Sequence, residues 1–527
     1  MSASSYPASA SENEISEFHN LGSWPSHWAQ LKPNQLAVGD ADRRLDWSSF
    51  AGRVGRASGL LQREGIQSGD RVAFLLRNRT AALEILFGTA RVGGICLPIN
   101  LRLTAREIAF QLDDCRPAAI FFESDIQALV EETLSLASHT PLLRVAVGGI
   151  DDAYEAALDQ ASETESPVAV SPDAPAILMY TSGTTGAPKG ALLPHRKALY
   201  NARNAIHGFQ IRSDDRVLVA APLFHSLGLQ ILSLPLLYAG GSLLLQDRFE
   251  PDAVWRAAEE EAISYFGGVP AMHQRLYQAL NNGASAGRRF PALRFIFSAG
   301  SAISAELIRD FSALDILVLQ GYGQTETSTL CCLDSDDALR KAGSVGRPVP
   351  HAEVRVVLRD TLGNDPRHWR DADPGDTGEI VVRGPINMLG YWERPAATAE
   401  TLIGDWLRTG DLARRDAEGF VTLVGRAREM FISGGENVYP AEVEAAYREH
   451  PAIREIAVIG VPDPTWGEVG RAHVILEPGE PLDEASLAAW AHTRLAGFKL
   501  PREIVIETEF PRTASGKVRK HRLKGPA

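Results

Sequence analysis

The chain of 527 residues is too long for one ordinary hydrophobic core, so we expect two or more domains. Its hydrophobic fraction of 45% and charged fraction of 23% are typical of a soluble globular protein. The net charge of -13 argues against nucleic acid as a partner, because that binding depends on Lys and Arg contacts to phosphate.

The cysteines and the apolar runs further narrow the class of protein to which the chain can belong. The four cysteines are too few for a disulfide framework and lack the paired spacing of a zinc site; they are Cys96, Cys115, Cys331 and Cys332. The polar, acidic N-terminal residues lack the basic start and apolar run of a signal peptide, so a cytoplasmic location is expected. The most apolar stretch, Leu229 to Leu245, contains Pro235 and two glycines, and we expect a buried helix followed by a strand rather than a membrane span.

From about Arg71 the chain alternates short β-rich runs with segments of helical spacing. The runs that we expect to be strands are RVAFLL, GICLPI, AAIFFE, AILMYT, RVLVAA, GSLLLQ, ISYFGGV and LRFIFSA. The segments that we expect to be helices are TAALEILFGTARVG, TAREIAFQLDDC, PDAVWRAAEEE and AMHQRLYQAL. This order predicts an α/β fold with parallel strands and helices layered on the sheets. Ligands of such folds bind near the carboxyl ends of strands.

Two changes of composition divide the rest of the chain. After about Gly363 a stretch rich in Gly, Asp and Pro leads into GEIVVRG, and we expect a small β-rich subdomain there. From about Gly425 a compact unit of roughly 100 residues begins, within the usual size range of a domain. It contains a helix pattern, the strands EIAVIGV and AHVILE, a further helix and a basic tail, which predicts a small α+β domain.

The segment YTSGTTGAPKGA, from Tyr180 to Ala191, begins at the end of the expected strand AILMYT. Its glycines let backbone N–H groups approach phosphate oxygens, while its hydroxyls and its lysine add further donors. It is not a Walker-type loop, because that pattern has Gly directly before Lys, and here Pro188 precedes Lys189. The segment therefore predicts another kind of polyphosphate-binding loop.

The segment GASAG, from Gly283 to Gly287, fits the nucleophile elbow of hydrolases by its letters alone. That elbow needs a strand before the serine and a helix after it. Here a helix pattern comes before it and two arginines follow, so we interpret the segment as a surface loop.

The segment YTSGTTGAPKGA closely resembles the phosphate loop of the adenylate-forming superfamily, which comprises acyl-CoA synthetases, peptide-synthetase adenylation domains and firefly-type luciferases. Further motifs of this family follow in the expected order: GYGQTET from Gly321 to Thr327, WLRTGDLA from Trp406 to Ala413, GRAREMFISGGENVYPAEVE from Gly425 to Glu444, and PRTASGKVRK from Pro511 to Lys520. The resemblance covers nearly the whole chain and is closest to the fatty-acid and aryl-acid CoA ligases.

The resemblance implies a nucleotide site. Tyr322 would stack on adenine, Thr325 would contact phosphate, and Glu326 would be a ligand of Mg²⁺, which prefers oxygen. Asp411 and Arg426 would contact the ribose hydroxyls. The nucleotide-binding residues implied are Thr181, Ser182, Gly183, Thr184, Thr185, Gly186, Lys189, Gly321, Tyr322, Gly323, Thr325, Asp411 and Arg426.

The resemblance also implies catalytic residues and a hinge. When a carboxylate attacks the α-phosphate, two negative charges meet, and the transition state needs preorganised cations. By resemblance Lys517 supplies one of them in the first half-reaction, and Glu326 and His225 are the other catalytic candidates. In the family the C-terminal domain rotates about a residue two after the ribose arginine, which is Arg428 here, where relatives usually have Asp or Lys.

The rotation defines the expected domains and the path of coenzyme A. We expect an N-terminal domain at 1–424, a hinge at 425–429 and a mobile C-terminal domain at 430–527. Gly434 and Gly435 would then lie beside the path of the pantetheine thiol, since glycine leaves room for close backbone approach.

The segment APLFHSLGL, from Ala221 to Leu229, follows a strand and is expected to face the acyl group. His225 is a candidate gate between the thiol and the adenylate, with a purely structural histidine as the alternative. It stands where peptide-synthetase domains typically carry an Asp for the α-amino group, which argues against an amino acid as substrate. The expected pocket walls are all neutral, which favours an acid that is apolar beyond its carboxylate; they are Phe224, Leu227, Ala299, Gly300 and Gly323.

We predict a two-step ligase that converts an acid and ATP to acyl-AMP and pyrophosphate, and then transfers the acyl group to coenzyme A, with Mg²⁺ as cofactor. A medium- or long-chain fatty acid is the first expectation for the acid, and an aryl or alicyclic carboxylate is the alternative. Three other functions stay open: loading of a carrier protein's phosphopantetheine arm, a luciferase-like oxygenase, and a nucleotide-binding regulator without catalysis. A homodimer is expected only by analogy with relatives.

Overall fold

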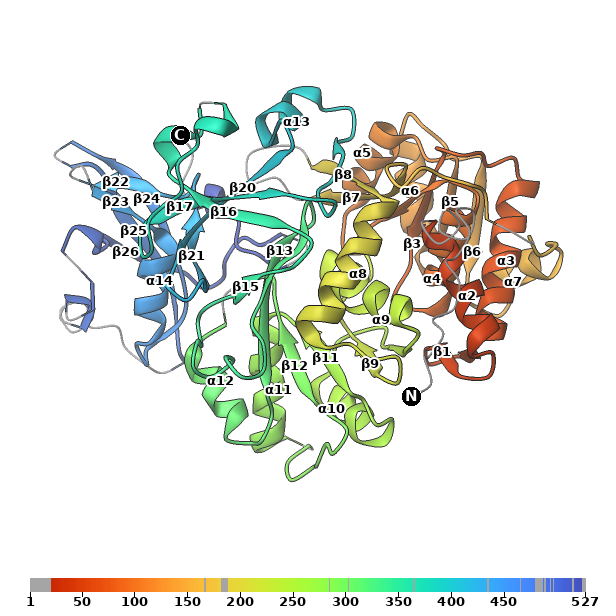
Figure 1. Cartoon of the computed structure of the whole chain (residues 1–527), viewed down its shortest axis with the longest axis horizontal. Coiled ribbons are helices and arrows are strands. Elements are labelled where there is room, and N and C mark those ends of the chain that lie inside the picture. The colour runs from red at the N-terminus through yellow and green to blue at the C-terminus, as the bar shows by residue number, and fades with distance from the viewer. Residues whose placement is uncertain are drawn as a thin grey trace, which may run out of the picture. The chain divides into compact units, whose positions relative to one another are not determined.

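The described part of the chain forms two compact units, each with its own core (Figure 1). The computed structural model describes residues 20–164, 167–181, 188–283, 285–301, 303–363, 365–433, 436–464, 466–478, 487, 490–492, 494–495, 497–513 and 516–523. The first unit holds the described residues up to Thr181, together with Lys189–Glu353 and Arg383–Asp405. The second unit holds Val354–Val382 and the described residues from Trp406 onwards. The expected domain boundary after residue 424 stays a prediction.

A nine-stranded sheet forms one layer of the first unit, in the order β15-β14-β13-β12-β11-β9-β10-β1-β2. Its strands are β1 (Leu36–Gly39), β2 (Arg44–Asp46), β9 (Arg216–Val219), β10 (Ser242–Leu245), β11 (Tyr265–Gly268), β12 (Phe295–Ser298), β13 (Val318–Gln324), β14 (Ser328–Cys332) and β15 (Arg347–Pro348). The pairs from β13 across to β1 are parallel, so the carboxyl ends of β9, β11, β12 and β13 meet at one edge. The outer pairs β1–β2, β13–β14 and β14–β15 are antiparallel.

A seven-stranded sheet, ordered β18-β8-β7-β4-β3-β5-β6, forms the other large layer of the first unit. Its strands are β3 (Arg71–Leu75), β4 (Ile95–Pro98), β5 (Ala119–Glu123), β6 (Leu143–Val147), β7 (Pro175–Thr181), β8 (Lys189–Pro194) and β18 (Gly390–Tyr391). The pairs from β7 to β6 are parallel, whereas β8 runs antiparallel to both β7 and β18. The ends of β7 and β8 therefore hold the expected phosphate loop between them.

Helices cover both sheets. The helical elements of the first unit are η1 (Leu21–Ser23), α2 (Trp24–Leu31), α3 (Trp47–Arg63), α4 (Thr80–Arg91), α5 (Ala105–Cys115), η2 (Ser124–Ile126), α6 (Gln127–Leu136), α7 (Ala153–Asp159), α8 (His195–Phe209), η3 (Leu227–Ser233), α9 (Leu234–Ala239), α10 (Pro251–Glu260), α11 (Pro270–Asn282), α12 (Ala305–Ser312) and α13 (Pro395–Thr401), which a short strand β19 (Leu402–Ile403) follows. Trp255 of α10 and Phe311 of α12 pack with Phe266 and Ile296 in the core of the nine-stranded sheet. Helix α8 contacts β8 and β14, and so touches both sheets.

The second unit contains two smaller sheets. Its elements are β16 (Glu353–Val357), η4 (Arg359–Thr361), η5 (Pro366–His368), β17 (Thr377–Arg383), β20 (Trp406–Arg415), β21 (Val421–Arg426), β22 (Phe431–Ser433), β23 (Glu436–Val438), α14 (Pro440–Arg448), β24 (Ile453–Asp463), β25 (Gly467–Leu476), η6 (Gly497–Lys499), β26 (Glu503–Ile506) and η7 (Lys520–Arg522). One sheet contains β16, β17 and β20 in this order, with β21 beside β20. The other is ordered β23-β22-β25-β24, with β26 beside β25. Val443 and Tyr447 of α14 pack on this second sheet.

The predicted fold class is confirmed: the chain is an α/β protein with a large unit of layered sheets and a smaller α+β part. Each of the runs expected to be a strand forms one, and the segments expected to be helices form α4, α5, α10 and α11. The apolar stretch Leu229 to Leu245 forms buried helix and then β10, as expected, but its first part, η3, is a π-helix. The antiparallel strand β8 was missed.

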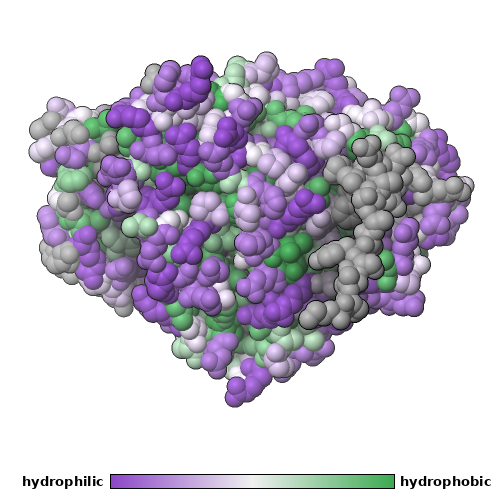
Figure 2. All heavy atoms as spheres, viewed as in Figure 1, coloured by the Kyte–Doolittle hydropathy of each residue, from purple (hydrophilic) through white to green (hydrophobic). Residues whose placement is uncertain are grey.

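The surface of the described residues is largely polar on the face drawn in Figure 2, with small hydrophobic areas between hydrophilic side chains. Among these residues no helix combines the length and the apolar character that crossing a membrane requires. All four cysteines are free thiols, and burial raises the pKa of Cys115 and Cys331 to about 12.

Candidate active site

The antiparallel pair β7–β8 places the two ends of the expected phosphate loop next to each other. Thr181 lies opposite Lys189 in the register, and its hydroxyl oxygen donates to the carbonyl oxygen of Lys189 at 3.3 Å. The loop residues between them lie outside the described residues; they are Ser182, Gly183, Thr184, Thr185 and Gly186. The hairpin geometry therefore fixes where this loop begins and ends.

Lys189 and Glu326, which the sequence assigned to phosphate and metal, are joined by a residue that sequence reasoning missed. The ammonium nitrogen of Lys189 lies 5.2 Å from the ring centroid of Tyr391. The hydroxyl of Tyr391 donates to Oε1 of Glu326 at 2.8 Å. Tyr391 stands in the segment MLGYW, and the Gly-Tyr pair in an otherwise apolar run was the signal available in the sequence.

The strand β13 and the turn after it carry the other residues expected around the nucleotide. Tyr322 is buried on β13, between two glycines that neighbouring atoms closely surround. A Cβ on Gly321 would lie 2.7 Å from the ring of Phe297, and one on Gly323 would lie 1.8 Å from the carbonyl oxygen of Ser328. The two glycines are therefore needed for the strand to run this close to its neighbours.

Thr325 and Glu326 lie in the turn between β13 and β14. The turn is closed by two hydrogen bonds, from the backbone N–H of Gln324 to Oγ1 of Thr327 at 3.2 Å and from the N–H of Thr327 to the carbonyl of Gln324 at 3.2 Å. Among the described residues no three His, Cys, Asp or Glu side chains cluster to hold a metal alone. Mg²⁺ is usually held by one or two carboxylates together with substrate phosphates, so the single carboxylate of Glu326 fits this ion.

A buried lysine, Lys197 on α8, supports the same turn. Its side chain is 1% exposed, and its ammonium hydrogen-bonds the hydroxyl of Ser328 and, at 3.3 Å, Oε1 of Gln230. Burial lowers the pKa of Lys197 to about 7, against the opposing attraction of the Glu326 carboxylate. Gln230 belongs to the π-helix η3, a geometry that is frequent at functional sites.

The residues expected around the acyl group lie at the carboxyl ends of the parallel strands β9, β12 and β13. Phe224 is buried, and its ring meets that of His225 edge-on with the centroids 4.7 Å apart. Leu227 begins the π-helix η3 directly afterwards. Ala299 and Gly300 follow β12, and Gly300 takes a φ of 88°, which favours glycine.

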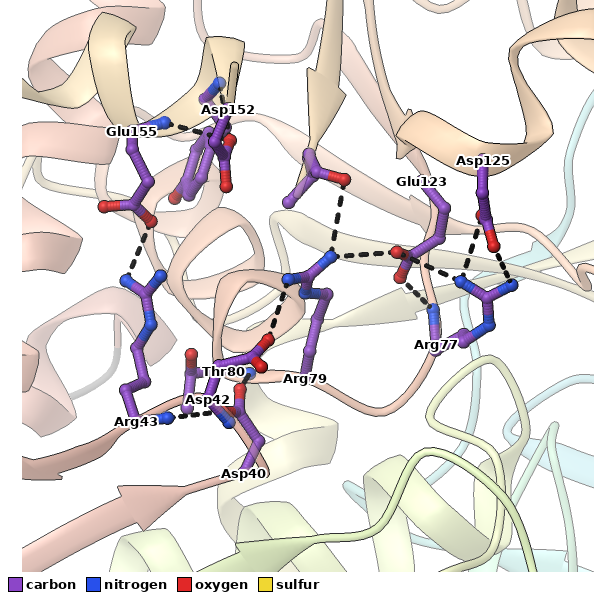
Figure 3. A network of polar contacts seen from close by, with 12 residues as sticks. Asp40, Asp42, Arg43, Arg77, Arg79, Thr80, Glu123, Asp125, Asp152 and Glu155 are labelled. Carbon is purple, nitrogen blue, oxygen red and sulfur yellow. Dashed lines mark hydrogen bonds and ion pairs between the residues drawn. The ribbon is translucent and has the colours of Figure 1, made fainter. Parts of the chain in front are cut away.

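A cavity of about 300 Å³ opens beside Phe224 and Pro222, and its wall carries Arg77, Arg102 and Arg248. Figure 3 shows the guanidinium of Arg77 between the carboxylates of Glu123 and Asp125. The hydrogen bonds that the guanidinium of Arg77 donates to the carboxylate of Asp125 raise the pKa of Arg77, so its positive charge is permanent. The cavity therefore combines apolar side chains with three guanidinium groups and the carboxylate of Asp247, which pairs with Arg248 at 3.5 Å; the sequence analysis did not predict this combination.

Asp411 and Arg426, the expected ribose contacts, lie in the second unit. They face each other across β20 and β21, and Nε of Arg426 is 2.7 Å from Oδ1 of Asp411. Arg428, the expected hinge residue, is exposed in the turn that follows β21. The N–H groups of Glu429 and Met430 donate to the carbonyl of Arg426 within this turn, at 3.0 and 3.2 Å.

Lys517 is exposed in a short hairpin near the C-terminus. The backbone N–H of Lys517 donates to Oγ1 of Thr513 at 3.1 Å, and the N–H of Thr513 donates to the carbonyl of Lys517 at 2.7 Å. The next lysine, Lys520, is paired with Glu429 and Glu444 instead, so it is a structural cation. The expected residues of the thiol path, Gly434 and Gly435, lie outside the described residues.

The segment around Ser285 has no features of a nucleophile elbow. The helix α11 ends at Asn282, shortly before this serine, and the hydroxyl of Ser285 donates to Oδ1 of Asp252 at 2.7 Å. Ser285 is buried rather than displayed on a strand end, so its interpretation as a non-catalytic loop residue agrees with the structure, although this serine is not on the surface.

The chain is similar to known families and proteins over most of its length. The family model described as AMP-binding enzyme matches residues 26–392, and the model of the AMP-binding enzyme C-terminal domain matches residues 442–517. A feruloyl-CoA synthase of an Amycolatopsis species is 38% identical over 96% of this chain and 98% of its own. An indoleacetate–CoA ligase of Aromatoleum aromaticum is 38% identical over 95% of this chain and 96% of its own. A long-chain-fatty-acid–CoA ligase of Mycobacterium tuberculosis is 33% identical over 96% and 98%.

A solved structure is also similar to the chain. The o-succinylbenzoate CoA synthetase from Bacillus subtilis, in complex with its acyl-adenylate intermediate, has a TM-score of 0.84 and 29% identity, over 96% of this chain and 98% of its own.

Proposed function

Because the chain belongs to the family of AMP-binding enzymes and is an acid–CoA ligase of that family, we propose that its carboxylic acid is aromatic. The observation that carries this proposal is the 38% identity to ligases of ferulate and indoleacetate, against 33% to a ligase of long-chain fatty acids. We therefore prefer the aryl carboxylate to the fatty acid that was first expected.

The first half-reaction joins the acid to AMP. An oxygen of the substrate carboxylate attacks the α-phosphorus of ATP, and the bond from that phosphorus to pyrophosphate breaks. Lys189, at the end of the phosphate loop, holds its ammonium 5.2 Å from the ring centroid of Tyr391 and supplies positive charge to the phosphates. Lys517 offsets the negative charge that develops between carboxylate and phosphate. Mg²⁺, when bound at Glu326, neutralises charge on the phosphate oxygens.

The second half-reaction forms the thioester. The thiolate of coenzyme A attacks the carbonyl carbon of the acyl-adenylate, and the bond from that carbon to AMP breaks. We propose that a rotation about Arg428 separates the two half-reactions, since a few residues at the end of an element can absorb such a change in φ and ψ. The turn Arg426–Met430, with its exposed arginine, suits this role.

The cavity beside Phe224 is the place that we propose for the phosphates of coenzyme A. Arg77, Arg102 and Arg248 supply positive charge on its wall, and arginine is well suited to phosphate because its planar group donates in parallel pairs. In a protein of net charge -13, three guanidinium groups on one wall supply the donors that an anionic co-substrate requires, and Asp247 on the same wall pairs with Arg248 at 3.5 Å.

The test is acid-dependent exchange between ATP and pyrophosphate across acids of similar size: ferulate, 4-hydroxycinnamate, indole-3-acetate, phenylacetate, octanoate and decanoate. We expect strong exchange with one or more aryl acids, weak exchange with the fatty acids, and a thioester on addition of coenzyme A. Exchange with octanoate or decanoate alone would restore the fatty-acid expectation. Exchange without thioester formation would point to a carrier protein as acceptor.

A further inference from the structure

We infer that Tyr391 is a positioning residue, which holds the Glu326 carboxylate and the Lys189 ammonium in the orientation that binds the triphosphate of ATP. The inference rests on the proposed function, because it concerns the nucleotide that the ligase uses. The hydroxyl of Tyr391 donates to Oε1 of Glu326 at 2.8 Å. The ring of Tyr391 contacts the ammonium of Lys189, whose nitrogen lies 5.2 Å from the ring centroid.

The register of the sheet brings Tyr391 and Lys189 onto one face. Tyr391 lies directly opposite Ala191 in the antiparallel pair β18–β8. Residues directly opposite each other in such a pair point to the same face, and so do residues two apart in one strand. Lys189, two residues before Ala191, is therefore the diagonal neighbour of Tyr391, which explains why its ammonium lies over the ring.

Backbone hydrogen bonds hold the segment that carries Tyr391 between the two sheets. The N–H of Met388 donates to the carbonyl of Glu326 at 2.8 Å, and the N–H of Trp392 donates to the carbonyl of Gly190 at 2.7 Å. One end of the segment is thus tied to the turn after β13, and the other is tied to β8. Because both ends of the segment are fixed, its backbone holds the hydroxyl of Tyr391 within hydrogen-bond distance of Glu326.

The residue before Tyr391 shows the same close packing. Gly390 takes a φ of 145°, and a Cβ there would lie 2.7 Å from Cγ2 of Thr398. Without that Cβ, Thr398 approaches closely enough for its hydroxyl oxygen to accept the N–H of Tyr391 at 2.9 Å. The local sequence therefore holds the tyrosine in one orientation.

The two contacts of Tyr391 differ in strength and in the ligand that they serve. A hydrogen bond that orients a metal-binding carboxylate typically contributes about 10-fold or more to metal affinity. An ammonium over a partly exposed aromatic ring contributes less, about two- to fivefold. Loss of the hydroxyl alone should therefore weaken the binding of MgATP. Loss of the whole ring should weaken the binding of both MgATP and metal-free ATP.

The experiment measures ATP binding by calorimetry, with excess Mg²⁺ and with the metal removed by chelation, for the full-length protein and three variants. Tyr391→Phe removes only the hydroxyl, and Tyr391→Leu removes the ring as well. Tyr154→Phe is the matched control, because the hydroxyl of Tyr154 also donates to a glutamate, Oε2 of Glu84 at 3.0 Å, among buried helices of the same unit. Thermal unfolding of each variant monitors the fold.

We expect Tyr391→Phe to bind MgATP about 10-fold more weakly and metal-free ATP within about twofold of the wild type. Tyr391→Leu should also lose about two- to fivefold for metal-free ATP, and Tyr154→Phe should match the wild type in both. Equal MgATP affinity in Tyr391→Phe and the wild type would overturn the inference, as would a parallel loss with and without metal.

The same samples separate this inference from the proposed function. The variants could show the expected pattern of ATP binding while the wild type catalyses no ATP–pyrophosphate exchange with any aryl acid. That result would refute the proposed substrate and leave the role of Tyr391 intact. Aryl-acid exchange with unaltered MgATP binding in Tyr391→Phe would refute the role of Tyr391 alone.

Discussion

Asp411 and Arg426 form an ion pair with each other, Nε to Oδ1 at 2.7 Å, although the sequence assigned both to the ribose of ATP. The side chain of Asp411 is 8% exposed and that of Arg426 is 46% exposed, so the pair is open to solvent on the arginine side. Because its carboxylate is buried, Asp411 needs a hydrogen-bond donor, which Arg426 supplies here and which a ribose hydroxyl could also supply. We propose that the buried carboxylate is the member of the pair that the nucleotide needs most.

Replacing Asp411 should therefore weaken ATP binding more than it weakens the fold. In Asp411→Asn the hydrogen bonds from the ribose hydroxyls lose their charged acceptor, and we expect the KM for ATP to rise about 10-fold or more. Asp371→Asn is the control, since Asp371 pairs with Arg355 at the same 2.7 Å in the same unit but lies outside the expected site. Steady-state kinetics with varied ATP would contradict the assignment if both variants shifted KM equally.

The strands were predictable because their cause is local. A buried run such as RVLVAA, bounded by polar turns, gives β9 whatever lies elsewhere in the chain. The π-helix η3 was not predictable in this way, because the apolar run from Leu229 suits any buried helix. Strand β8 was missed because the segment after Lys189 was interpreted only as the end of a loop.

The two site residues that were missed owe their importance to partners far away in the chain. Tyr391 meets Glu326 across a separation of 65 residues, and Lys197 meets Ser328 across 131. In the sequence Lys197 is an ordinary residue of a helix and Tyr391 has only the preceding glycine to mark it, so their contacts distinguish them far better than their sequence context. The expected nucleotide residues were instead predicted from contiguous motifs, whose chemistry is visible within a few positions.

The buried Lys197 should make the stability of the protein depend on pH. Burial lowers its folded pKa to about 7 from the usual 10.5 of a lysine, so the unfolded chain binds an extra proton between these two values. The free energy of unfolding should then rise with pH from about 7 upward, by up to about 1.4 kcal/mol per unit, and be independent of this group below its folded pKa.

The variant Lys197→Met isolates this contribution because its side chain has a similar length and cannot titrate. We expect the difference in unfolding free energy between wild type and Lys197→Met to shift in favour of the wild type from pH 7 to pH 9. Urea unfolding of both proteins at each pH measures it. A difference that stays constant over this range would show that Lys197 keeps its proton in the folded state.

Lys517 should affect only one half-reaction. We propose that it stabilises the charge that develops between carboxylate and α-phosphate and has no part in attack by the thiolate. In Lys517→Ala we expect the rate of ATP–pyrophosphate exchange to fall about 10²- to 10³-fold. Thioester formation from added acyl-adenylate and coenzyme A should stay close to the wild-type rate. Since Lys517 is exposed, its removal leaves the fold intact; equal losses in both half-reactions would refute the assignment.

Replacing the arginines beside Phe224 should weaken the binding of coenzyme A and leave the binding of ATP unchanged. In the double variant Arg102→Ala, Arg248→Ala we expect the KM for coenzyme A to rise about 10-fold at low salt, because charge-assisted hydrogen bonds to its phosphates are lost. The effect should shrink at high salt, since ions screen exposed charges. ATP–pyrophosphate exchange, which needs no coenzyme A, should be unchanged.

The control for this prediction is the double variant Arg288→Ala, Arg289→Ala, which removes the same charge from the same unit outside the cavity. Arg288 pairs with Glu259 there. If the control raises the KM for coenzyme A as much as the first variant does, long-range attraction of the whole surface explains the effect. If neither variant raises it, the cavity does not bind the phosphates of coenzyme A, and its positive charge has another role. A rise confined to the first variant, and lost at high salt, places these phosphates beside Phe224.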